Sequence, residues 1–366
     1  MIIANRKNDV LRAASLLLLL LLSVLPAWAC AICAPVDGRG TLSQALRQAD
    51  TVVLASPVAG GAGLAVRQLI KGAPPQGLIR LPASEPRPLP VEPTALSQLL
   101  YHQGSAGWQS AGPLDASRAD WLRQLLALPP VTDGSAPDWD RRLAFFVMDL
   151  ESPEPLVAQA AYEEIAIAPY GEMRRLRGRL RAAWLLDWLD TPRLAARRPL
   201  YALLLGVSGE PERAPALQQR LARLRQPADA AVLSAMLAAW LELQGESGVA
   251  WLEQHYLQAP GLQEWEYQAA LLALSVHGND GQRVSRARVV KAYADFVRQD
   301  TPLAGWVASD LGNWGRWEFD QRYAALLRSG RPQSFASRYA MVFYLMRNPK
   351  PQARALLDAL RAEGAL

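Results

Sequence analysis

Cysteine and histidine are scarce in this chain of 366 residues, which has two cysteines and three histidines. A structural zinc site needs about four ligands. His102, His255 and His277 are far apart in the sequence and match no metal-ligand spacing. No acid–base pair or nucleophile motif is recognisable either. We therefore expect no catalytic residues, no cofactor and no histidine-based metal site.

A large excess of one charge is also missing, since 39 Lys and Arg face 34 Asp and Glu. Residues 1–29 hold three basic residues and one acidic residue, so the remainder has 36 against 33. This balance gives no electrostatic reason to expect nucleic-acid binding. Arginines cluster locally at Arg174–Arg181 and Arg220–Arg225. They are typical of solvated helix faces, and the alternative is a groove for an acidic partner.

Long apolar runs are absent except at the front of the chain. Three basic residues precede an apolar run that ends at Pro26 and includes seven consecutive leucines. Ala27-Trp28-Ala29 follows this run. This pattern predicts a secretory signal peptide over residues 1–29, and the alternative is an uncleaved anchor. No later run reaches the roughly 20 residues of a membrane span. The 35 arginines and 4 lysines fit a GC-rich bacterium. We expect a periplasmic or secreted bacterial protein with no transmembrane span after signal removal.

The two cysteines lie together in Cys30-Ala-Ile-Cys33, at the start of the expected mature chain. In an oxidising compartment two neighbouring thiols tend to form a disulfide. A Cys-x-x-Cys pair can also be redox-active or bind a soft metal such as Cu(I). Cys30 and Cys33 are therefore candidates for a disulfide, for thiol redox chemistry or for soft-metal handling.

Residues 30–135 are expected to form a small β-rich domain. A helix is predicted over 41–50, and Asp115 is a candidate N-cap for another helix over 116–128. β-branched and apolar segments bounded by Gly and Pro predict five strands between them. These strands are 51–58, 64–70, 78–81, 96–102 and 108–111.

The start of this region has a distinctive set of residues: Cys30, Cys33, Pro35, Ala45, Ala49-Asp50, Val52-Val53, Pro57-Val58 and Lys71-Gly72. At these positions it resembles netrin-like modules, the group that includes tissue inhibitors of metalloproteinases. The resemblance implies a five-stranded barrel. In the inhibitors the first cysteine chelates a protease zinc, a role that only Cys30 could inherit. The chain lacks their distant cysteine partners and has Cys-x-x-Cys in place of Cys-x-Cys.

Residues 138–366 are helical and repetitive in pattern. Prolines recur at intervals of 30 to 42 residues, at Pro153, Pro192, Pro227, Pro260, Pro302 and Pro332. Proline suits the first turn of a helix. After most of them an i, i+3, i+4, i+7 apolar stripe appears, and a second helix follows a Gly or Asn-Pro breaker. This region resembles the HEAT class of α-solenoids. A non-repeating helical bundle is the alternative.

The predicted stripes lie on five helices, and Asp310 interrupts the pattern in the unit that begins at Pro302. The stripes are Ala158/Ala161/Tyr162/Ile165, Leu200/Leu203/Leu204/Val207, Leu233/Met236/Leu237/Trp240, Tyr267/Ala270/Leu271/Leu274 and Tyr339/Val342/Phe343/Met346. We expect each stripe to be buried against the next helical pair.

Tryptophan is frequent in the unit that breaks the repeat. Trp306, Trp314 and Trp317 lie there, and Trp and Arg are common at binding hot spots. With Arg174 and Arg175 they are our candidate partner-binding residues, and the alternative is ordinary core packing. The overall expectation is an α+β protein with a β-barrel-like head and a HEAT-like tail. It would act as an exported, non-catalytic scaffold or adaptor for a protein partner, or alternatively as a periplasmic redox or soft-metal factor.

Overall fold

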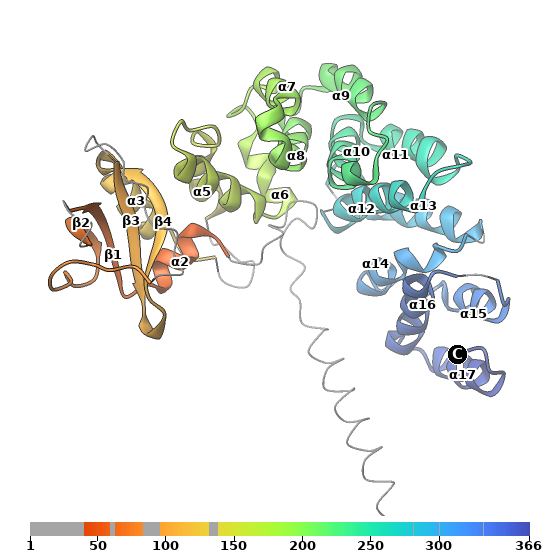
Figure 1. The fold of residues 1–366 in the computed structure, drawn as a ribbon. Coiled ribbons are helices and arrows are strands. Elements are labelled where there is room, and N and C mark those ends of the chain that lie inside the picture. The colour runs from red at the N-terminus through yellow and green to blue at the C-terminus, as the bar shows by residue number, and fades with distance from the viewer. Residues whose placement is uncertain are drawn as a thin grey trace, which may run out of the picture. The chain divides into compact units, whose positions relative to one another are not determined.

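The computed structural model describes residues 40–58, 63–82, 96–131, 138–280, 282–299, 301–331 and 333–366 (Figure 1). The expected signal peptide, Cys30, Cys33 and Pro332 lie outside these residues. The chain divides into two compact units, Met1–Glu172 and Met173–Leu366. The domain limits expected from the sequence, 30–135 and 138–366, stay predictions. An α+β layout is confirmed, because the first unit contains a sheet and the second is helical.

The first unit is built around four antiparallel strands in the order β2-β1-β3-β4. Its elements are α2 (Leu42–Gln48), β1 (Thr51–Pro57), β2 (Leu64–Lys71), β3 (Leu96–Gln103), β4 (Gly107–Asp115), α3 (Ala119–Ala127), α4 (Trp139–Val147) and α5 (Pro155–Ala166). Strands β2 and β4 are the two edges of this sheet. The described sheet is therefore open, and the expected five-stranded barrel is wrong.

The expected fifth strand at 78–81 fails because it forms only one isolated bridge, between Ile79 and Leu64. The two residues exchange both backbone hydrogen bonds, each 2.9 Å long. The Ile79 side chain then joins Val53, Leu64 and Leu100 in the core on one face of the sheet. The segment acts as a short apolar cover for the β2 edge rather than as a strand that closes the sheet.

A buried ion pair ties helix α2 to the helices that follow the sheet. Glu164 of α5 is fully buried and pairs with Arg142 of α4, which is 2 % exposed. Glu164 also accepts hydrogen bonds from the hydroxyls of Thr41, at 2.6 Å, and Ser43. Thr41 is the N-cap of α2. A buried carboxylate needs such partners, because an unpaired one would cost several kcal/mol in desolvation, about 3–5 kcal/mol in measured cases.

The second unit consists of short helices joined by tight turns. These are α7 (Ala182–Asp190), α8 (Arg198–Ser208), α9 (Ala214–Leu221), α10 (Ala230–Gln244), α11 (Glu246–Leu252), α12 (Glu264–Asp280), α13 (Arg286–Arg298), α14 (Ala308–Asn313), α15 (Asp320–Arg328), α16 (Phe335–Arg347) and α17 (Pro351–Ala362). A one-turn helix, α6 (Tyr170–Met173), precedes them. Helix α8 packs against α10, and α10 packs against α12. Helix α16 packs against α14, α15 and α17.

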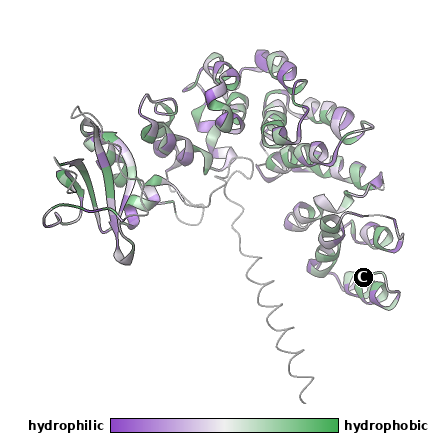
Figure 2. Cartoon of the chain, viewed as in Figure 1, coloured by the Kyte–Doolittle hydropathy of each residue, from purple (hydrophilic) through white to green (hydrophobic). Residues whose placement is uncertain are grey.

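The predicted stripes of α8 and α10 are entirely buried, and those of α5 and α12 are buried except for half-buried Tyr162 and Tyr267. Close approach helps α8 and α10 to pack, since a Cβ on Gly206 would lie 2.7 Å from the Cα of Ala239. The stripe predicted for α16 is wrong. Tyr339 and Met346 are 50 % and 59 % exposed, and α16 buries Met341, Tyr344 and Leu345 instead. Figure 2 shows the hydrophobic residues of these helices in green.

Candidate functional site

The carboxyl end of α12 brings together two of the predicted partner-binding residues, Arg174 and Trp314. The Arg174 guanidinium binds Glu242 of α10 through two hydrogen bonds of 2.8 and 2.6 Å, and it also pairs with Asp280. The Trp314 indole N–H donates to the Asn279 Oδ1 at 2.8 Å. Adjacent residues of α12 thus hold an arginine and a tryptophan that are 140 positions apart in the sequence.

Arg174 is held inside the second unit by charge. Its side chain is 13 % exposed, and that of Glu242 is 1 % exposed. Burial opposes the charged form, but the hydrogen bonds and charges of Glu242 and Asp280 outweigh it and raise the pKa of Arg174 above its ordinary value. Because its guanidinium binds two carboxylates, Arg174 joins α10 and α12 in this structure.

Trp314, at the end of α14, is packed between neighbouring helices. Its ring stacks on Tyr293, with centroids 5.8 Å apart and an interplanar angle of 9°. The Arg286 guanidinium lies 5.5 Å from the ring centroid, within the range of a cation–π contact. A Cβ on Gly278 would lie only 2.3 Å from the indole, so glycine is required there. Trp314 is half-buried, and the residues that contact it all belong to the second unit.

The remaining predicted partner-binding residues have other neighbours. Trp317 packs against Tyr344 of α16, with ring centroids 5.1 Å apart. Trp306 is half-buried in the 3₁₀ turn that precedes α14. Arg175 is exposed. Trp314 and Trp317 thus contact different helices although they are three residues apart, and Cys30 and Cys33 lie outside the described residues.

Asp310, which interrupts the repeat pattern, accepts a hydrogen bond of 2.8 Å from the Tyr293 hydroxyl. Burial raises the pKa of the Asp310 carboxyl, and hydrogen bonds from Ser275 and Tyr293 offset part of this effect. Burial, followed by the Asp310 charge, raises the pKa of Tyr293. Tyr293 is 1 % exposed, so this pair is buried polar structure between α13 and α14 rather than a site open to substrate.

The sequence reasoning missed an exposed apolar surface on α16. Phe335 is 86 % exposed, and Tyr339 and Met346 are at least half exposed. The Tyr339 and Phe343 rings stack with centroids 6.2 Å apart, and the Arg347 guanidinium lies 5.5 Å from the Phe343 centroid. We call these five residues the α16 face. The available signal was a second apolar stripe, Met341, Tyr344 and Leu345, on another side of the same helix.

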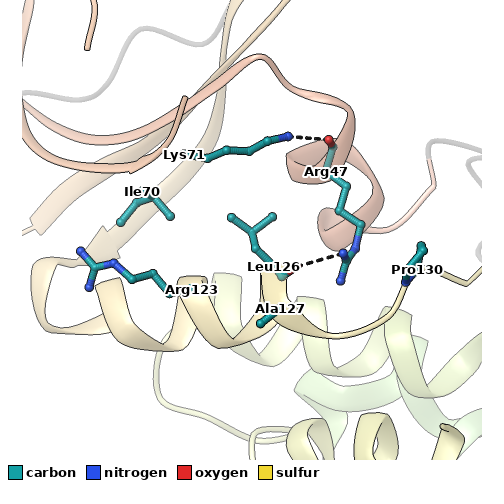
Figure 3. Close-up of a pocket in the computed structure, with 7 residues that line it drawn as sticks. All are labelled: Arg47, Ile70, Lys71, Arg123, Leu126, Ala127 and Pro130. Atoms are coloured by element: carbon teal, nitrogen blue, oxygen red, sulfur yellow. Dashed lines mark hydrogen bonds between the residues drawn. The ribbon is translucent and has the colours of Figure 1, made fainter. Parts of the chain in front are cut away.

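The first unit contains a pocket of 640 Å³ beside α2 and α3 (Figure 3). It is lined by Arg47, Ile70, Lys71, Arg123, Leu126, Ala127 and Pro130. Three of these residues are cationic, which suggests an anion site. However, Lys71 donates hydrogen bonds of 2.6 Å to the carbonyls of Arg47 and Ala49 at the end of α2.

Arg47 is similarly committed to the end of α3, where it donates to the carbonyls of Leu125 and Leu126 at 3.0 and 2.9 Å. Cations are favourable at helix carboxyl ends, where the last carbonyls lack partners. Arg123 is exposed and pairs with Asp120. Arg47 and Lys71 thus cap two helices and Arg123 pairs with an aspartate, and we assign no ligand to the pocket.

Within the described residues, no three His, Cys, Asp or Glu side chains are grouped so as to hold a metal ion. None of the helices placed by the structure combines the length and apolar character that a membrane crossing requires. No family model, curated protein or solved structure gave a significant match to the chain.

Proposed function

We propose that the chain is an exported, non-catalytic protein-interaction module that presents the α16 face to a protein partner. The observation that supports this most directly is the exposure of Phe335, Tyr339 and Met346 on one helix. An apolar surface costs free energy in water, about 25 cal/mol per Å². Clustered exposed apolar side chains therefore mark interaction surfaces more often than scattered ones do.

A HEAT-like solenoid is the architecture that we propose for the second unit. Helices α8, α10 and α12 pack in sequence order, and α9, α11 and α13 each pack beside a member of that row. In a solenoid each helical pair buries its apolar side against adjacent pairs. The buried stripes of α8 and α10 are consistent with this arrangement.

Aromatic and arginine side chains make the α16 face suited to a partner. Tyr and Arg are enriched among residues that dominate binding energy, and rigid aromatic rings lose little conformational entropy on binding. The stacked rings of Tyr339 and Phe343 and the arginine beside them provide such a surface.

Site-specific photo-crosslinking of the full chain, in the cells that export it, tests this proposal. A photoreactive residue replaces Tyr339 in one variant and Trp184 in another. Trp184 is a matched control, because it is 40 % exposed in the same unit and also has an arginine, Arg181, 5.1 Å from its ring centroid. We expect a discrete protein adduct from position 339 and none from 184. Equal labelling at both positions, or no adduct at 339, would refute the proposal.

A further inference from the structure

The segment that contains α16 has a one-sided charge. Between Asp320 and Asp358 the chain has seven basic residues and no acidic residue. The whole unit from Met173 has 26 Lys and Arg against 18 Asp and Glu, whereas Met1–Glu172 has 13 against 16. The near balance of the whole chain thus conceals a basic second unit with an acid-free stretch around α16.

One of these cations lies at an aromatic ring of the α16 face, and two others follow it closely in the sequence. Arg347 is exposed, donates to the Asn313 Oδ1 at 2.9 Å and lies beside the Phe343 ring. Lys350 and Arg354, in and just before the first turn of α17, are exposed as well. Glu318, an acidic residue of the preceding loop, pairs with Arg316, and its charge also interacts with that of Lys350. The α16 face therefore combines an apolar centre with one arginine, and two exposed cations follow it in the chain.

We propose that the α16 face binds an acidic amphipathic segment of a partner protein, with apolar side chains on the aromatic rings and carboxylates near Arg347, Lys350 and Arg354. From Phe335 to Met346 the helix rises about 16 Å, at about 1.5 Å per residue. This is the length of about three helical turns, so a partner helix of about three turns could lie along it with one apolar side in contact. The inference rests on the proposed function and adds the chemistry of the partner.

One feature favours a protein segment over an anionic lipid surface, the other ligand that basic amphipathic helices bind. The neighbouring α14 adds the Asn313 amide, which Arg347 already contacts, and amides form directional hydrogen bonds. Directional polar groups beside an apolar centre resemble the polar rim of a protein interface.

Selection from a random-peptide library against the purified full chain tests the chemistry of the partner. We expect the enriched peptides to have net negative charge and apolar residues one helical turn apart. Tyr339→Ser should weaken peptide binding about tenfold or more. Replacing Lys350 and Arg354 with Gln should weaken it and reduce its salt dependence. Trp184→Ser should leave the affinity unchanged. Fluorescence anisotropy measures all of these affinities.

Several outcomes overturn the inference: no enrichment, neutral or basic peptides, or peptides whose affinity ignores Tyr339→Ser. It is also overturned if the chain instead sediments with phosphatidylglycerol vesicles through Tyr339, or if ultracentrifugation shows a dimer that Tyr339→Ser abolishes. When an adduct still forms at position 339 in the crosslinking experiment, these failures concern only the chemistry of the partner. When none forms, the proposed function itself fails.

Discussion

Helices α10 and α16 have the same apolar spacing but opposite environments. In α10 every residue from Leu233 to Leu243 is buried, including Glu242. In α16, Phe335, Tyr339 and Met346 face solvent. Helix α10 lies between α8 and α12, with α9 and α11 also in contact, whereas α16 packs against the 3₁₀ turn Ala304–Val307 and against α14, α15 and α17. The difference shows that a stripe becomes core only where another helix covers it.

The largest effect should come from the buried charge of α10. Glu242→Ala removes the carboxylate that binds the buried Arg174 through two hydrogen bonds, and loss of one member of a buried ion pair costs about 3–5 kcal/mol. The corresponding exposed arginine of α16 should matter little, so Arg347→Ala should cost at most about 1 kcal/mol. Urea unfolding measures both free energies.

A triple variant tests the cause of that loss. Replacing Glu242 with Leu, Arg174 with Met and Asp280 with Asn removes all three charges of the buried cluster, so much of the stability should return. If the triple variant is as unstable as Glu242→Ala, packing rather than the unpaired arginine explains the loss.

The next effect compares apolar side chains of the two helices. Leu237 of α10 is fully buried, so Leu237→Ala should lower the free energy of unfolding by about 2–5 kcal/mol. Met346→Ala should change it by no more than about 0.5 kcal/mol, because Met346 is already in solvent. Thermal and urea unfolding of the pair provide the measurement. Equal losses would contradict the exposed position of the α16 stripe.

A smaller effect is expected at the end of α14, which lies between α10 and α16 in the sequence. Trp314→Phe keeps an aromatic ring beside Tyr293 but removes the hydrogen bond to Asn279. Such a bond contributes about 0.5–1.5 kcal/mol, and we expect a loss of this size. Asn279→Ala should cost about as much alone and add little in the double variant, which a double-mutant cycle measures. Full additivity would mean that the two side chains do not interact.

The smallest effect should be a change in pH dependence from Asp310→Asn. Burial raises the pKa of the Asp310 carboxyl above its ordinary value of 3.8, so ionisation is less favourable in the folded state than in the unfolded chain. The stability of the native chain is therefore reduced as pH rises through the folded pKa. An amide does not titrate, so the variant should gain most relative to the native chain near pH 7. This gain should shrink below about pH 4. A constant difference across this range, in urea unfolding at each pH, would rule out the titration.

Most helices and strands could be predicted, because their signals are local. Asp115 and Asp138 cap the turns and helices that they precede, and strands β1 to β3 follow β-branched or apolar runs. These local signals could not exclude the expected five-stranded barrel. Whether segment 78–81 forms a strand depends on pairing with β2, which is a contact between distant residues.

The candidate site was only partly predictable for the same reason. Tryptophan frequency pointed to Trp314 and Trp317, but the structure packs them against Tyr293 and Tyr344. The α16 face was hidden because its spacing is that of a core stripe. When one helix has two apolar sides, the sequence indicates that at least one of them is buried. Packing against the neighbouring helices decides which side that is.

By itself the sequence determined most of the helices, four of the five expected strands, the apolar helix stripes and the basic stretch between Asp320 and Asp358. Periodicity, capping and charge are properties of neighbouring residues, so they can be read along the chain. Tertiary structure alone decided that Arg174 is buried with Glu242 and that Tyr339 remains exposed. Whether a side chain is buried depends on which distant part of the chain packs against it and excludes water. The local sequence pattern does not specify that part.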